Sequence, residues 1–203
     1  KFLSPKLACA AAILLAVSCK KSFNDQDKDL QADLSARTAN TEAVVLQNHS
    51  VTPALIKALP GFENLEIYSL ISSDDTLKQS PGYVFGGSAD GSGLLRGTFA
   101  NGRKNFIYIV NHEDNYAVSR VIFDASFKPI KGEYILNSNG GLWRLCSATM
   151  ATPGEQGFGP TYFTSGESGE ESRTHALNPL EKSFSPTLSK ELPALGRWSA
   201  ENA

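Results

Sequence analysis

One thiol and several carboxylates are the side chains of this sequence best suited to chemistry. Cys146 lies far from the other two cysteines, because Cys9 falls inside an N-terminal apolar run and Cys19 ends it. A cysteine without a disulfide partner can be a metal ligand, a reactive thiol or a buried apolar residue. Residues 167–171 add three glutamates, across one predicted hairpin from Cys146. A thiolate beside carboxylates suits a transition metal such as iron, whereas oxygens alone suit calcium.

Two shorter segments supply further carboxylates. Residues 110–113 read Val-Asn-His-Glu at the end of the most apolar predicted strand, where Asn111 and Glu113 could ligate a hard cation. The alternative is a capped turn with a solvated glutamate. Residues 196–201 place an arginine and Glu201 around an aromatic residue, a pattern with little meaning alone. For Cys146, a packed thiol in the core is the commoner outcome.

The N-terminus has the features of an export signal. Two lysines precede an apolar run over residues 7–17, and Cys19 follows almost at once. This run is shorter than the about 20 apolar residues of a membrane-spanning helix. We therefore expect residues 1–19 to be a lipoprotein signal peptide, with Cys19 lipidated to anchor an exported protein in the bacterial cell envelope. Ala16 stands where such signals usually have Leu, which leaves a periplasmic product open.

Charge and composition limit the classes of partner that the protein could bind. Lys and Arg number 19 against 21 Asp and Glu, so no positive field favours nucleic acid. Hydrophobic residues make up 41% of the chain, which is enough for a globular core. Residues 20–50 are polar, with few large apolar side chains, and we expect them to be a flexible tether between membrane anchor and domain. We expect a monomer.

From residue 51 onward, short β-type runs separated by Gly, Pro, Asn and Asp predict an all-β fold. Cys146 lies on one predicted strand, residues 86–93 are predicted as a loop, and the other strands are predicted at residues 65–71, 82–85, 106–110, 118–123, 133–136, 162–164 and 174–177. Repeated four-stranded units would build a β-propeller. At about 40 to 50 residues per blade, the length allows about three to four blades. We therefore expect residues 51–203 to be the N-terminal part of a longer propeller domain.

Taken in order, these segments resemble the PhoX-type alkaline phosphatases, which are exported β-propeller enzymes. The resemblance runs from about residue 83 to the end and rests on the Cys146 strand, residues 110–113, 117–120 and 164–167, and the Gly-Arg-aromatic-x-x-Glu motif at residues 196–201. In that family a cluster of iron and calcium ions lies in the central channel of the propeller. A cysteine thiolate and glutamates hold the irons, and the phosphate ester binds over the metals.

The resemblance implies a role for each matched residue. Cys146 matches the cysteine that bridges the irons, and Glu167 matches the glutamate on the next strand. Glu201 matches the glutamate that ends the Gly-Arg-aromatic motif, and Glu113 is matched to a calcium ligand. The implied activity is metal-assisted hydrolysis of a phosphate monoester in the cell envelope, with iron and calcium as cofactors.

Two other interpretations remain open. The chain could be a surface-attached propeller that binds a ligand or glycan without turnover and uses calcium only to hold its loops. It could also be a phytase-like or lactonase-like propeller that depends on calcium alone. Ala200, where the family motif commonly has His, leaves room for such alternatives. Iron separates the three interpretations, because in the last two Cys146 would be a packed core thiol.

Overall fold

The structure, a computed structural model, describes residues 44–98, 100–137, 144–180 and 189–201. In these residues the regular structure is β, with two antiparallel sheets and two short 3-10 turns, η2 (Gly169–Glu171) and η3 (Pro193–Leu195). No helix of this part of the chain has the length and apolar composition needed to cross a membrane. The all-β prediction is confirmed. The predicted signal segment with Cys19, and most of the predicted tether, lie outside the described residues.

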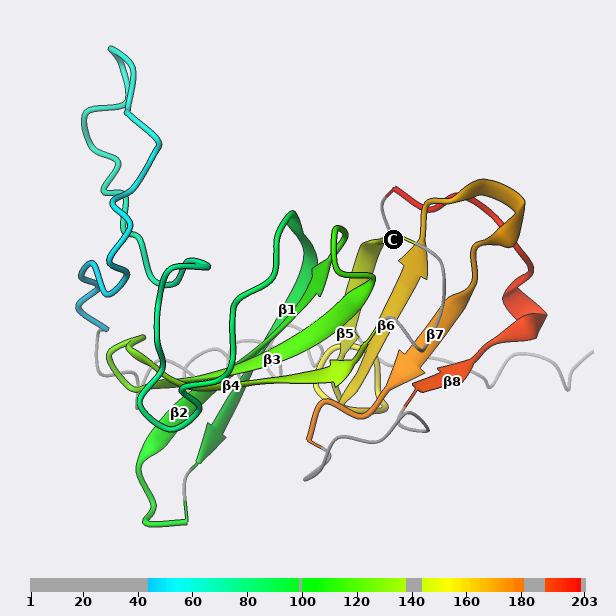
Figure 1. The fold of residues 1–203 in the computed structure, drawn as a ribbon. Coiled ribbons are helices and arrows are strands. Elements are labelled where there is room, and N and C mark those ends of the chain that lie inside the picture. Colours follow the sequence, from blue (N-terminus) through cyan, green and yellow to red (C-terminus); the bar gives the residue numbers. More distant parts are fainter. Residues whose placement is uncertain (1–43, 99, 138–143, 181–188, 202–203) are drawn as a thin grey trace, which may run out of the picture. The chain divides into compact units, whose positions relative to one another are not determined.

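The first sheet is a meander of four strands in sequence order (Figure 1). Its strands are β1 (Ala89–Thr98), β2 (Lys104–His112), β3 (Ala117–Asp124) and β4 (Pro129–Leu136). Each strand runs antiparallel to the next. Ile, Val, Phe and Tyr are frequent in β2 and β3, and these residue types favour strands. The strands predicted at residues 106–110, 118–123 and 133–136 are confirmed.

The second sheet repeats this arrangement with β5 (Leu145–Ala151), β6 (Thr161–Gly166), β7 (Thr174–Leu177) and β8 (Ser189–Glu191). The predictions for the Cys146 strand and for residues 162–164 and 174–177 are confirmed. β8 was not predicted, because its Ser-Lys-Glu sequence has no apolar residue to mark a strand. The described residues thus hold two four-stranded antiparallel meanders.

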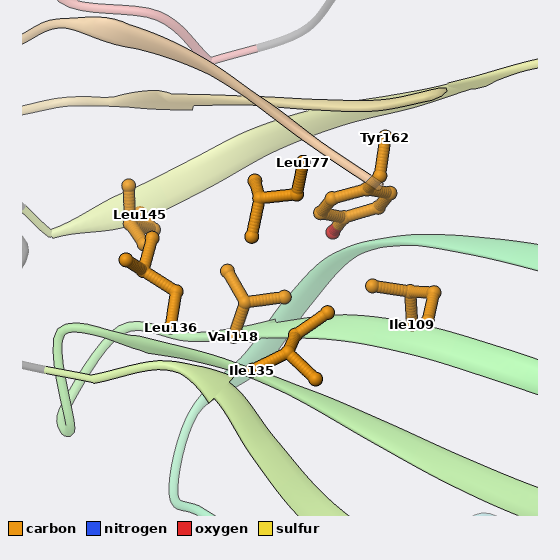
Figure 2. Packing of buried hydrophobic residues seen from close by; sticks show 7 residues of the cluster. All are labelled: Ile109, Val118, Ile135, Leu136, Leu145, Tyr162 and Leu177. Atoms are coloured by element: carbon orange, nitrogen blue, oxygen red, sulfur yellow. The ribbon is translucent and has the colours of Figure 1, made fainter. Parts of the chain in front are cut away.

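An apolar core joins the two sheets, and Figure 2 shows how its side chains meet. The first sheet contributes Ile109, Val118, Ile135 and Leu136, and the second contributes Leu145, Tyr162 and Leu177. Each of these side chains is almost fully buried. Burial of one such side chain contributes roughly 1.5–3 kcal/mol. This cluster therefore holds the two sheets together and sets how closely β1 and β5, which are in contact, can lie.

The other face of the first sheet is covered by residues 70–85 rather than by more strands. Leu77 and Tyr83 are buried there against Val121 and Phe123 of β3. The strands predicted at 65–71 and 82–85 are therefore wrong, since these residues form irregular segments. Leu70, Ile71, Tyr83 and Phe85 of these segments pack on top of the sheet instead of alternating within it. The residue pattern alone does not separate the two cases.

Residues 86–93 were predicted as a loop, but β1 begins within them at Ala89. The glycines serve close packing here. A Cβ atom on Gly91 would lie 2.2 Å from the carbonyl oxygen of Cys146, and one on Gly93 would lie 2.6 Å from the Cβ of Met150. Real Cβ atoms do not approach so closely, so the missing side chains allow β1 to lie directly against β5.

Candidate metal centre

Five side chains with metal-binding groups gather around Cys146. The ligand atoms of Asp90, Glu113 and Cys146 all lie within 4.8 Å of one another, and so do those of Cys146, Glu167 and Glu201. Cys146 is buried, Glu113 and Glu167 are half-buried, and Asp90 and Glu201 are exposed. The structure therefore brings together the four residues that the resemblance matched to metal ligands. We call these five residues the Cys146 cluster.

Cys146 lies near the start of β5, where the pairing with β6 is irregular between Leu145 and Ala148. Such irregularities re-aim side chains and are frequent beside functional sites. Its thiol is free. The Sγ atom lies 3.7 Å from the carbonyl oxygen of Glu201 and 3.7 Å from its carboxylate Oε2. The thiol is thus buried but directed at acidic side chains, which is an unusual environment for a core cysteine.

Asp90 reaches the cluster from the first sheet, and the sequence analysis missed it. It lies in a second irregular stretch, between Ala89 and Ser92 of β1, whose partner is β2. The next residue, Gly91, is the one whose missing side chain lets β1 approach β5 at Cys146. The Gly-rich composition made this strand resemble a loop in the sequence. The same glycines indicate a close approach of two strands, and that signal could have pointed to Asp90.

Glu167 and Glu201 are positioned by backbone contacts at the end of β6. The amide N–H of Ala200 donates a hydrogen bond to the carbonyl oxygen of Gly166 (3.0 Å), and the Ser199 hydroxyl donates one to the carbonyl oxygen of Glu167 (2.5 Å). Ala200 is fully buried. The segment that carries Glu201 is therefore attached beside Glu167, although the two residues are far apart in sequence.

Arg144 connects two of the carboxylates across the cluster. Its Nη2 lies 2.5 Å from Oε2 of Glu113, and its Nε lies 3.5 Å from Oε1 of Glu167. The amide N–H of Glu167 also donates a hydrogen bond to the carbonyl oxygen of Arg144 (2.9 Å), which holds the two backbones together. The arginine therefore supplies one positive charge to a group of four carboxylates.

Asn111 ties the first sheet to the strand that carries the thiol. Its Nδ2 donates to the carbonyl oxygens of Cys146 (2.8 Å) and Ser147 (3.2 Å), and its Oδ1 accepts from the hydroxyls of Tyr162 and Thr164, each at 2.9 Å. The amide thus makes four buried hydrogen bonds, its full capacity. The sequence analysis placed Asn111 at the rim as a candidate cation ligand; the structure buries it as the support of Cys146.

His112 also turns inward, away from the cluster. It is fully buried, and its Nε2 lies 2.6 Å from the hydroxyl of Ser119, which in turn lies 2.8 Å from the hydroxyl of Tyr83. Burial lowers the pKa of His112 to about 4, so the ring is neutral at physiological pH. Within residues 110–113 only Glu113 reaches the Cys146 cluster.

Two members of the cluster, Cys146 and Glu113, have raised pKa values. Burial raises the pKa of the Cys146 thiol well above its usual range, and Asp90, Glu201 and Glu167 add to the rise. A hydrogen bond with Asp90, followed by burial, raises the pKa of Glu113, while Arg144 acts in the opposite direction. Like charges this close disfavour ionisation. A bound cation would reverse this effect, because a metal ligand must be deprotonated.

The donor set fits the metals that the resemblance implies. One sulfur among several carboxylates suits iron, and the carboxylates alone suit calcium, which takes oxygen ligands. Asp90 and Glu201 lie at the exposed side of the cluster, so an ion or substrate can approach from solvent there. The Cys146 cluster therefore offers one sulfur and four carboxylates as potential ligands for a cation.

Comparisons with known proteins add no assignment to this geometry. No protein-family model, no curated protein and no solved structure matches the chain. The argument for function therefore rests on the residues of the Cys146 cluster and on the elements that position them.

Proposed function

We propose that this chain belongs to a β-propeller phosphatase of the bacterial cell envelope, in which the Cys146 cluster holds iron and calcium for the hydrolysis of a phosphate monoester. In this proposal the protein is exported, monomeric and attached to the membrane through a lipid on Cys19. Cys146, Glu167 and Glu201 hold iron, and Glu113 contributes to calcium binding. Asp90 joins Glu113 as a further ligand.

One observation carries the proposal. Carboxylate oxygens from separate parts of the chain gather around the thiol of Cys146. They belong to Glu113, Glu167 and Glu201, and to Asp90. Cys146 and the three glutamates are the positions that match ligands in the PhoX-type phosphatases. A fold has no structural need to bring four carboxylates to one place, since their mutual repulsion opposes folding. Their convergence therefore supports a cation site of that class.

The sheet arrangement supports the propeller part of the proposal. Propellers are built from four-stranded sheets around a central channel, and the two sheets of this chain are four-stranded meanders in sequence order. Their first strands, β1 and β5, are in contact and carry Asp90 and Cys146. A cluster at the junction of two first strands agrees with a metal centre in such a channel.

The residues of the cluster have distinct tasks in this proposal. Bound cations would neutralise the non-bridging oxygens of a phosphate ester, where charge is spread in the transition state. The half-buried Glu113 and Glu167 hold the cations from the protein side, and Asn111 keeps the Cys146 backbone in place. The exposed Asp90 and Glu201 line the side from which an ester would enter.

Metal analysis of the exported protein and its Cys146→Ser variant tests the proposal. We expect iron and calcium in the parent together with hydrolysis of a simple phosphomonoester such as p-nitrophenyl phosphate. The variant should lose iron and activity, because a serine hydroxyl is a poor substitute for a thiolate ligand. Thr149→Ser, on the same strand but outside the cluster, should change neither property and serves as the matched control.

Other outcomes would decide between the alternatives. Calcium without iron in both proteins would overturn the iron phosphatase and leave a calcium-dependent propeller with a packed thiol. Activity on phosphate esters would then separate a phytase-like enzyme from a binding module. No metal in either protein would contradict the metal centre itself.

A further inference from the structure

Arg144 occupies a position that the proposed function leaves unexplained. It bridges Glu113, which belongs to one of the two groups of ligand atoms, and Glu167, which belongs to the other. Cys146, two residues further along the chain, belongs to both. The guanidinium therefore neutralises carboxylates from the two groups at once, in the region where cations would sit.

The energetics argue against a purely structural role for this arginine. Its side chain is 47% exposed, and ion pairs of an arginine with that exposure contribute little to stability. Its backbone, in contrast, is held by two hydrogen bonds: its N–H donates to the Ser168 hydroxyl (3.2 Å), and its carbonyl accepts from the Glu167 amide (2.9 Å). A fixed backbone with a half-exposed side chain allows the guanidinium to leave its carboxylates at small cost while staying beside the cluster.

We propose that Arg144 is an internal counter-ion of the cation-free site, and that cations displace it so that its guanidinium binds the anionic ligand. This inference rests on the proposed function. A divalent cation would take its ligands from the same carboxylates that Arg144 contacts, so the two compete. Once released, a planar guanidinium offers paired N–H donors that match the oxygens of a phosphate group.

The two halves of this proposal predict opposite changes in one variant. Removal of the positive charge in Arg144→Gln should tighten calcium binding at least about threefold, because a competitor for the carboxylates is lost. The same change should weaken the binding of inorganic phosphate to the calcium-loaded protein at least about tenfold, because the fork of donors is lost. Arg144→Lys should keep the competition but recover only part of the phosphate affinity.

Titration calorimetry with calcium chloride, and then with inorganic phosphate on the loaded protein, measures both effects without any assay of turnover. Arg103→Gln removes the same charge from an exposed turn away from the cluster and is the matched control. An Arg144→Gln variant with unchanged or weaker calcium binding would overturn the proposal, since the arginine would then merely brace Glu113 and Glu167. Unchanged phosphate affinity would overturn its second half.

The same experiment separates this inference from the proposed function. Calcium binding in the variant but not in the parent would support the counter-ion role while contradicting a working metal centre in the parent chain. Tight calcium binding in both, with no difference between them, would leave the metal centre standing and remove the role of Arg144. Absence of calcium binding in both proteins would overturn the two together.

Discussion

The apolar core between the sheets and the Cys146 cluster are built from the same two sheets but follow opposite physical rules. The core brings together seven buried hydrophobic side chains, and their removal from water stabilises the fold (Figure 2). The cluster brings together four carboxylates and a thiol, and the carboxylates repel one another, an effect that Arg144 offsets only in part. The apolar core therefore stabilises the fold, whereas repulsion within the Cys146 cluster opposes folding and has to be offset by the stability of the core.

This difference separates residues that serve the fold from residues that serve binding. Leu145, which is buried in the core, and Cys146 are adjacent on β5. Asn111 lies between the regions, because it contacts the Cys146 backbone on one side and the core residue Tyr162 on the other. Substitutions in the three places should therefore have different signatures.

The largest effect is expected at the link between the two regions. Asn111→Ala would leave two hydroxyls and two carbonyl oxygens without their buried partner, and we expect a loss of about 3 kcal/mol or more in the free energy of unfolding. Urea denaturation measures it. Asn101→Ala is the control, because Asn101 accepts a single hydrogen bond, from the Arg103 amide, in an exposed turn. A loss at Asn111 no larger than at Asn101 would show that the network does not hold the sheets.

A smaller effect is expected for a substitution in the Cys146 cluster. It should lower calcium affinity but, unlike a substitution in the core, should not lower the free energy of unfolding. Glu167→Gln removes one of the crowded charges, so stability without cations should be unchanged or slightly higher. Calcium affinity should fall at least tenfold, which is about 1.4 kcal/mol of binding free energy. Calorimetric titration and urea denaturation test the two parts. Glu170→Gln, three residues along and exposed, should change neither; destabilisation by Glu167→Gln alone would mean that the cluster is structural.

The smallest effect concerns the pH dependence of the first sheet. His112 has its pKa lowered to about 4 by burial, so the unfolded chain binds the extra proton more readily than the folded one. The contribution of neutral His112 to the free energy of unfolding is complete above the ordinary histidine pKa of about 6.5. It is lost as the pH falls from there toward about 4. Between about pH 7.5 and 5.5 the loss should be on the order of 1 kcal/mol. Urea denaturation at both pH values should show a smaller difference for His112→Gln than for the parent and for a His49→Gln control.

Residue type and spacing were sufficient to predict most of the strands, whereas four members of the cluster were proposed with the help of the resemblance to the PhoX-type phosphatases. Continuous apolar runs such as that of β2 have few stable alternatives to a buried strand. The errors have a common cause. Residues 65–71 and 82–85 include apolar side chains, such as Ile71 and Tyr83, that pack onto a sheet rather than within one. The glycines before residue 94 resemble a loop in sequence but serve the close approach of two strands.

The lone thiol singled out Cys146 from residue type, and the resemblance to the PhoX-type phosphatases pointed to Glu113, Glu167 and Glu201 before any folding was considered. Their meeting, and the inclusion of Asp90 and Arg144, depend on how the second sheet packs against the first. That packing is a long-range property, because burial of the apolar core sets the distance between β1 and β5. Local sequence patterns report which side chains are present and which strands they favour, but not which distant strands will pack together, since no local signal encodes that contact.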